Sequence, residues 1–256
     1  SADEVTIWTD VDGVFTADPR IVATARRIET ISYEEMLEMA ASGAKVLHLR
    51  CVEYARRFGV KVHVRSSFSH REGTWVTNQP GEAMEDAIIS GVAHDRSEAK
   101  VTVVGVPDKP GKAAAIFKAV AAADVNLDMI VQNVSAAATG LTDVSFTLPK
   151  TDGQKALNAL TAHKEVVGFD SLQYDDQIGK VSLIGAGMRT HPGVSARFFD
   201  ALATTGVNIE MISTSEIRIS VVTRAEDVDT AVRAVHSAFG LDADQIEAVV
   251  YGGTGR

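Results

Sequence analysis

Two turns that end in Pro-Gly carry residue types well suited to holding a small anion. Residues 108–112 (DKPGK) lead into one expected helix, and residues 190–194 (THPGV) lead into another. Glycine lets the backbone approach a ligand with no Cβ in the way, and the unpaired N–H groups in the first turn of a helix attract negative charge. The chemistry that fits both turns is the binding of a carboxylate.

Acceptor side chains recur after each of these helices. Asn126 and Asp128 follow the first helix, and Asn208 and Glu210 follow the second. Their oxygens suit an ammonium group, so an amino acid lying between a Pro-Gly turn and the neighbouring strand would have both of its charges matched. Pro-Gly and Asn are also ordinary turn formers. Their recurrence at matched positions favours ligand binding over turn chemistry alone.

The matched positions belong to an internal repeat. The run VTVVG at 101–105 recurs as VSLIG at 181–185, an offset of 80 residues, whereas Pro-Gly at 110 and Val-Asn at 125 recur at an offset of 82. The two additional residues fall in the turn before Pro-Gly, where an insertion is tolerated. We therefore expect two copies of one structural unit.

The apolar pattern of each copy predicts strands and helices in the order β-α-β-β-α-β. This order describes a split βαβ unit with an antiparallel sheet and two helices on one face. Two such units bury more apolar surface together than apart, which favours pairing within or between chains. The expected strands are 101–105, 129–134, 142–148 and 171–174 in the first copy, and 181–185, 211–214, 218–222 and 246–251 in the second.

The residues before the repeat predict a strand, a loop, two helices and a strand. Ser32 and Glu35 form a capping box that starts the first helix, and Gly59 supplies a left-handed end for the second. A polar run at 77–81 predicts a linker. We expect domains at 1–80, 81–170 and 171–256, and exchange of the last strand between the two copies stays open.

Composition excludes several classes of partner. The 256 residues carry a formal net charge of −9 with no compensating basic cluster, so we expect neither nucleic acid nor membrane as a partner. Cys51 has no second cysteine for a disulfide, which favours a reducing, cytoplasmic setting. The seven histidines share no spacing with acidic or thiol ligands, so we expect no metal site.

Six segments give the chain a resemblance to a known family. They are 8–20 (WTDVDGVFTADPR), 32–40 (SYEEMLEMA), 64–67 (VRSS), 132–135 (QNVS), 185–188 (GAGM) and 213–220 (STSEIRIS). Together they resemble aspartokinases of the actinobacterial type. The resemblance implies an α/β (α+β) fold: tandem ferredoxin-like βαββαβ ACT domains, preceded by the C-terminal fragment of an amino-acid kinase α/β domain.

The resemblance also implies that the N-terminal fragment contributes to an ATP site. A lysine and an arginine can neutralise phosphate oxygens, and Asp10 can accept a hydrogen bond from a ribose or an adenine. Taken alone, Asp10 would be part of a strand-ending turn and Lys45 an exposed charge. The implied ATP-binding residues are Thr9, Asp10, Phe15, Thr16, Ala17, Asp18, Pro19, Arg20 and Lys45.

In the repeat, the resemblance implies feedback binding of threonine or lysine. The second copy has His191 and Glu210 where the first has Lys109 and Asp128, so the two sites need not hold the same effector. The implied effector-binding residues are Asp108, Lys109, Pro110, Gly111, Lys112, Ala113, Asn126, Leu127, Asp128 and Gln132 in the first copy. In the second they are Gly179, Lys180, Gly193, Val194, Ser195, Ala196, Arg197, Phe198, Asn208, Ile209, Ser213 and Thr214.

The family converts ATP and L-aspartate to 4-phospho-L-aspartate, the first step toward lysine (through diaminopimelate), threonine and methionine. That reaction uses Mg²⁺ with ATP, whose ligands we expect outside this chain. The family's Lys-containing Gly-Gly-Ser segment and its Gly-Arg-Gly-Gly-Ser-Asp segment, which cradle phosphate and aspartate, do not occur here. We therefore expect no catalytic residues and an inactive fragment.

Three functions follow from these expectations. The first and preferred one is the feedback-regulatory region of an aspartokinase, paired into a homo-oligomer through its ACT domains. The second is a stand-alone amino-acid-binding subunit that forms a hetero-oligomer with a full-length kinase subunit. The third, retained kinase activity, is disfavoured by the absent phosphate-binding segments.

Overall fold

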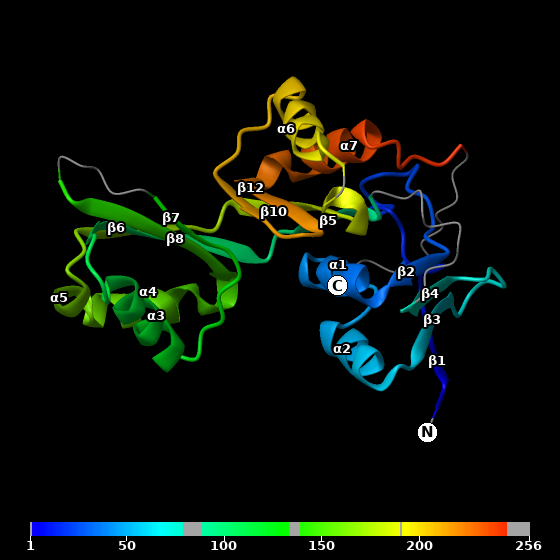
Figure 1. Cartoon of the computed structure of the whole chain (residues 1–256), viewed down its shortest axis with the longest axis horizontal. Helices are drawn as coiled ribbons and strands as arrows, with labels where there is room; N and C mark the ends of the chain where they lie inside the picture. Colours follow the sequence, from blue (N-terminus) through cyan, green and yellow to red (C-terminus); the bar gives the residue numbers. More distant parts are fainter. Residues whose placement is uncertain (1, 79–88, 134–138, 190, 245–256) are drawn as a thin grey trace.

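The computed structural model describes residues 2–78, 89–133, 139–189 and 191–244, which form an N-terminal part and two units that each have a four-stranded antiparallel sheet (Figure 1). The N-terminal part holds a sheet of strand order β1-β3-β4-β2 beside helices α1 (Tyr33–Ala41) and α2 (Leu49–Phe58). Its strands are β1 (Glu4–Thr9), β2 (Thr30–Ser32), β3 (Lys61–Ser66) and β4 (Thr74–Thr77). The sequence does not predict β2 and β4, because three or four residues are too few to show an alternating pattern.

The helix ends predicted in this part are confirmed. The Ser32 hydroxyl accepts the N–H of Glu35 at 3.2 Å, and the Glu35 carboxylate accepts the N–H of Ser32 at 3.4 Å. α2 ends at Gly59, whose φ of 66° is the left-handed conformation that glycine adopts without strain.

The first unit has the predicted order of elements. Its antiparallel sheet has the order β7-β8-β6-β9, and a core of buried aliphatic residues with Phe146 and Phe169 lies between the sheet and its helices. The strands are β6 (Glu98–Pro107), β7 (Ile130–Gln132), β8 (Leu141–Pro149) and β9 (Ser171–Asp175). The helices are α3 (Lys112–Ala122), α4 (Gly153–Ala162) and the short α5 (Lys164–Val167).

The second unit repeats this arrangement with one strand taken from elsewhere in the sequence. Its sheet has the order β11-β12-β10-β5, so β5 (Gly91–Asp95) occupies the edge that β9 occupies in the first unit. The other elements are β10 (Ile178–Ile184), α6 (Val194–Thr204), β11 (Met211–Thr214), β12 (Arg218–Arg224) and α7 (Val228–Ala238). The predicted strand at 246–251 lies outside the described residues.

The sheets therefore do not follow the domain boundaries at 80 and 170. β9 lies beyond residue 170 and hydrogen-bonds to β6 in the first unit, whereas β5 precedes the first unit and pairs with β10 in the second. We propose that the first unit extends to Asp175 and that the second unit takes in both β5 and the residues from β10 onward.

The two sheets are also covered differently. Burial alternates along β6, whose unit has helices on one face. In the second unit α6 and α7 lie on one face of the sheet and α1 lies on the other (Figure 1). All seven residues of β10 are buried, because Ile184 packs in the cluster of the N-terminal part while Ile178 packs with Met129 of the first unit. The second unit is thus the one that joins the N-terminal part. No helix among the described residues is long and apolar enough to cross a membrane.

Candidate functional site

A cavity of about 860 Å³ lies between the N-terminal part and β5. Two loops of the N-terminal part line it: one follows β1 and the other follows α1 and contains Lys45. Of the residues predicted to bind ATP, the structure brings these together around the cavity: Thr9, Asp10, Phe15, Ala17, Asp18, Pro19, Arg20 and Lys45.

Some of the charged side chains that line the cavity form ion pairs, among them Arg20 with Asp18. Arg20 donates from Nε and Nη2 to the Asp18 carboxylate, at 3.0 and 2.7 Å. Burial alone would raise the pKa of Asp18, but hydrogen bonds from Arg20 and its charge outweigh burial and lower that pKa. The exposed Lys45 adds a second cation to the lining. Apolar walls with the cations Arg20, Lys45 and Arg96 fit a nucleotide, whose base needs apolar contact and whose phosphates need positive charge.

Thr16 is the predicted ATP-binding residue that does not line the cavity. Its side chain is buried, and its Oγ1 lies 2.8 Å from Nε2 of His236 in α7. Oγ1 also accepts the backbone N–H of Arg26 at 2.9 Å. Thr16 therefore links the cavity loop to the second unit.

The free energy of unfolding should fall in acid because of His236. Burial lowers the folded-state pKa of His236 from its ordinary 6.5, with the charge of Asp242 opposing. As the pH drops below 6.5, the unfolded ring takes up a proton before the folded ring does, at a cost of up to about 1.4 kcal/mol per pH unit until the folded pKa is reached. Urea unfolding at pH 7.5 and 5.5 measures this loss. Burial lowers the pKa of His94 as well, so His236→Gln should remove part of the pH dependence, and an unchanged slope would contradict the role of His236.

A third wall of the cavity comes from β5 and the turn after it, which the sequence did not point to. His94, Asp95, Arg96 and Ser97 line the cavity, and Val92 donates its N–H to the carbonyl of Thr16 at 2.7 Å. A further contact comes from Gly43, where an added Cβ would lie 2.0 Å from the carbonyl oxygen of His94. A strand of the second unit therefore holds both cavity loops.

The two Pro-Gly turns are the starts of helices, as predicted. Gly111 is the N-cap of α3 with φ 94°, and Gly193 is the N-cap of α6 with φ 98°. A Cβ added at either glycine would meet nothing within 4 Å, so both bends are open to a ligand. A second cavity, of about 480 Å³, adjoins Gly193 and is lined also by Arg26 and Phe239.

Within the chain, the bends do not lie beside the acids that were expected to complete their sites. Asp128 donates its N–H to the carbonyl of Thr147, and Thr147 pairs with Lys100 near the start of β6. The Gly111 bend follows the other end of β6. At about 3.3 Å per residue, the two ends are roughly 25 Å apart. The expectation that one amino acid spans bend and acid within one unit is wrong, because they lie at opposite ends of a strand.

Asp128 and Glu210 instead bind lysine side chains of the opposite unit. Lys180 Nζ donates to Asp128 Oδ2 at 2.5 Å, and Lys100 pairs with Glu210. The two lysines are 80 residues apart and the two acids 82, which are the offsets of the repeat. The units therefore face each other through reciprocal ion pairs across an approximate twofold axis, with Met129 and Met211 packed together nearby.

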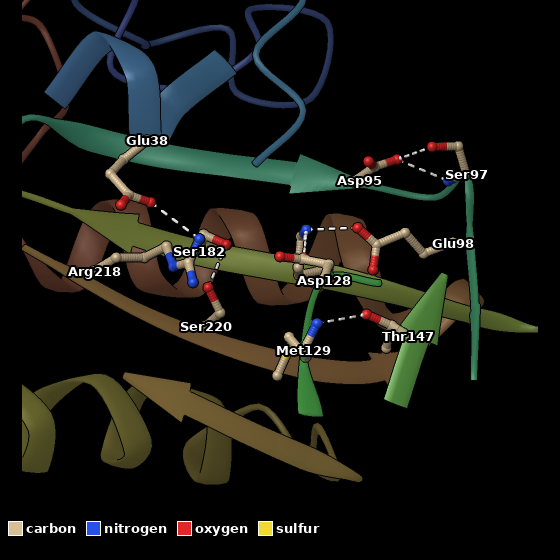
Figure 2. Close-up of polar contacts among 11 residues, drawn as sticks. Glu38, Asp95, Ser97, Glu98, Asp128, Met129, Thr147, Ser182, Arg218 and Ser220 are labelled. Carbon is tan, nitrogen blue, oxygen red and sulfur yellow. Dashed lines mark hydrogen bonds and ion pairs between the residues drawn. The ribbon is translucent and has the colours of Figure 1, made fainter. Parts of the chain in front are cut away.

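Of the two lysines in these ion pairs, Lys180 is more deeply buried than Lys100. It is 1 % exposed and also donates to Glu98 Oε1 at 2.6 Å. Figure 2 shows Glu98, at the start of β6, and Asp128, just before β7, close to each other at this point. Burial alone would lower the pKa of Lys180, but the charges of Glu98 and Asp128 outweigh it and raise that pKa. Burial raises the pKa of Glu98, against the opposing charge of Lys180. Lys180 is thus a buried cation that joins the two units.

Comparisons with known proteins agree with this architecture. Residues 1–66 match the model of the amino acid kinase family, and residues 101–163 and 181–239 match the model of the ACT domain. The chain is 62% identical over all its 256 residues to the aspartokinase of Mycolicibacterium smegmatis. It is 42% identical to the ligand-free regulatory subunit of aspartate kinase from Thermus thermophilus, covering 99% of that chain with 59% of its own, at a TM-score of 0.56.

The chain belongs to the aspartokinase family. It spans 61% of the length of the mycobacterial aspartokinase. Escherichia coli aspartokinase III has the same fold: 93% of this chain matches 52% of that enzyme at a TM-score of 0.79 and 29% identity in the complex with aspartate and ADP. The match to its complex with lysine and aspartate has a TM-score of 0.72 at 30% identity.

This aspartokinase chain joins its kinase fragment to its second ACT domain through Glu35. The Glu35 carboxylate is buried and accepts from the Ser90 hydroxyl at 2.5 Å and from the N–H of Ala186 at 3.0 Å. Figure 2 shows the neighbouring pair, in which Arg218 of β12 donates to Glu38 of α1 at 3.0 Å. No described side chains form a group of three or more His, Cys, Asp or Glu that could hold a metal ion.

The remaining effector residues predicted for this aspartokinase fall into three groups. Phe198 lies in the core, and Gly179 is buried beside Lys180. Lys112 donates to the carbonyl of Val166 at 2.7 Å, and Lys112, Ala113, Leu127, Val194, Ile209 and Ser213 are half-buried. The exposed residues are Asp108, Lys109, Pro110, Asn126, Gln132, Ser195, Ala196, Arg197, Asn208 and Thr214.

Proposed function

We propose that this chain is the allosteric regulatory region of an aspartokinase and that it binds threonine, lysine or both as feedback inhibitors. The observation that carries the proposal is the pair of open Pro-Gly bends, at matched positions of two ACT domains, each with glycine at a left-handed φ. A bend of this kind presents helix amides to a carboxylate with no side chain in the way. Escherichia coli aspartokinase III, a relative, has been seen with lysine.

We propose further that each effector site is completed between two chains. The acids lie roughly 25 Å from the bends of their own domain, and the ion pairs bring the two domains of one chain together at the acid ends. The bends are left at the outer ends, where a partner chain could supply the ammonium acceptors. The partner is a second copy or, as the alternative, a full-length kinase subunit.

The cavity between the kinase fragment and β5 is proposed to hold part of ATP with Mg²⁺. Lys45 and Arg20 would face phosphate oxygens, and Asp10 would accept from the nucleoside. Bound ATP supplies the phosphoryl group for aspartate in the parent reaction. We propose that the chain by itself does not catalyse this transfer, because it lacks the family's phosphate-cradling segments. A cytoplasmic setting is part of the same proposal.

Titration calorimetry with threonine and with lysine, beside a coupled assay with ATP and aspartate, tests this proposal. Saturable binding of either amino acid without turnover is the expected result. Turnover by the chain alone would contradict its inactivity, and absence of binding by both amino acids would contradict the regulatory role. The assembled mass, measured with and without a full-length kinase subunit, distinguishes a self-paired region from a subunit of a hetero-oligomer.

The Gly193→Ala change should weaken effector binding by about tenfold or more. A Cβ at this N-cap would stand at the bend, and φ 98° would be strained, so the amides would no longer present the same surface. Gly206→Ala is the matched control, because Gly206 has φ 74° with the same open surroundings but follows the other end of α6. Calorimetry on both variants measures the difference, and equal affinities would remove Gly193 from the site.

A further inference from the structure

The cavity loop that follows β1 also packs into the core of the second ACT domain. Phe15, Ala17, Val22 and Ala25 belong to one buried cluster with apolar residues of α6, α7 and β10. Arg233 of α7 adds a hydrogen bond from Nε to the carbonyl of Ile21 at 3.0 Å. The shape of the loop therefore depends on contacts with the regulatory part of the chain.

A chain of polar contacts crosses this interface at Thr16. Its Oγ1 accepts the N–H of Arg26 at 2.9 Å, and its hydroxyl proton has two acceptors within reach: Nε2 of His236 at 2.8 Å and the carbonyl of Leu241 at 3.4 Å. The shorter contact favours donation to an unprotonated Nε2 of His236. The proton of the neutral ring then lies on Nδ1, which faces Asp242 Oδ1 at 3.3 Å. Asp242 in turn accepts from the hydroxyl of Thr24 at 2.5 Å. Both ends of this chain of contacts lie in the loop, and its centre is on α7.

We infer that His236 is a positioning residue for the nucleotide cavity: by accepting from Thr16, it holds residues 15–20 in the shape that lines the cavity. His236 does not itself line the cavity. The burial that lowers its pKa keeps the ring neutral at physiological pH, as this hydrogen bond requires. The inference rests on the proposed role of the cavity in nucleotide binding. It gives the second ACT domain a specific contact through which to change nucleotide affinity.

Two substitutions at His236 separate the hydrogen bond from the packing of the helix. The amide of Gln reaches the position of Nε2 and can accept from Thr16, whereas the amide of Asn reaches only the position of Nδ1, beside Asp242. His236→Gln should therefore preserve the loop, and His236→Asn should release it. Thr16→Val, which keeps the shape of the side chain but removes its hydroxyl, should act like His236→Asn.

Hydrogen exchange at the amides of Thr16 and Arg26, and the affinity for a fluorescent ATP analogue with Mg²⁺, are the two measurements on the full chain. His236→Asn and Thr16→Val should speed exchange at both amides and lower the affinity, each by about tenfold, the value of one hydrogen bond. His236→Gln should change neither by more than about twofold. Hydrogen exchange in β6 and β8, which belong to the other ACT domain, should be the same in all three variants as in the unmodified chain. This exchange is the control that the variants are folded.

Equal behaviour of His236→Asn and His236→Gln would overturn the inference, as would an unaffected loop in Thr16→Val. If the unmodified chain binds no ATP analogue, the proposed nucleotide role of the cavity fails. The exchange rates at Thr16 and Arg26 would still decide whether His236 positions the loop, so the two failures are distinguishable.

Discussion

The Lys180→Met change should destabilise the chain by about 3–5 kcal/mol. Glu98 is 7 % exposed and has Lys180 as its cation, so removal of the ammonium leaves a buried carboxylate without a partner of opposite charge. Methionine fills a similar volume, so the loss is one of charge and hydrogen bonding rather than of packing. Urea unfolding monitored by circular dichroism measures the change in the free energy of unfolding.

The repeat supplies the matched control for this change. Lys100 occupies the equivalent position in β6, but its side chain is 21 % exposed, and its partner Glu210 is also paired with Arg224. Lys100→Met should therefore cost only about 1 kcal/mol. Adding Glu98→Gln to Lys180→Met should recover much of the lost stability, because the isolated charge is gone. A cost at Lys180 no greater than at Lys100 would show that the buried ion pair does not join the two units.

The second large effect is expected for Gly43→Ala. A Cβ at Gly43 would lie 2.0 Å from the carbonyl oxygen of His94, and the backbone there has φ 106°. The Cβ is fixed directly to the backbone of residue 43 and the oxygen belongs to the backbone of His94, so neither can rotate away. The Lys45 loop and β5 must therefore separate, at a cost of roughly 3–5 kcal/mol from strain and overpacking together. The same separation opens the proposed nucleotide cavity, so the affinity for an ATP analogue should fall along with the free energy of unfolding.

Gly59→Ala isolates the backbone contribution to that result. Gly59 ends α2 with φ 66°, and a Cβ there would meet nothing within 4 Å. Its substitution should cost only about 1–2 kcal/mol and leave nucleotide affinity unchanged. If the two glycine variants lose the same stability, the close approach of β5 to the Lys45 loop is not a tight contact in solution.

Local chemistry made much of this fold predictable. The Ser32–Glu35 capping box, the left-handed Gly59 and the Pro-Gly helix starts each depend on a few neighbouring residues, and each is found where the sequence indicates it. The repeat predicted the order of elements in the first ACT domain and from β10 to α7 of the second, because its apolar pattern is kept in strand, turn and helix. The prediction that the loops with Arg20 and Lys45 lie together came from the family resemblance. A short acidic turn and a lone lysine do not indicate a shared site by themselves.

Long-range pairing was not predictable from local patterns. Nothing in residues 91–95 shows that β5 pairs with a strand more than 80 residues later, or that its end lines a cavity. The acids at 128 and 210 were assigned to a ligand because a single sequence does not show the lysines opposite them. His236 was interpreted as an isolated histidine, since Thr16 lies 220 residues away. In each case the missing information is the relative placement of two units.

The pairing of β5 with β10 determines where the first ACT domain is connected to the rest of the chain. Asp95 lies opposite Lys180 in the sheet, so the chain leaves the second domain and returns to it at nearly the same place. The intervening domain is therefore an insertion into a β-hairpin. Its removal, with a two-residue turn joining the two strands, leaves the described sheet of the second domain complete. Such an arrangement would let the inserted domain be exchanged for one of different amino-acid preference while the contacts to the kinase fragment stay as they are.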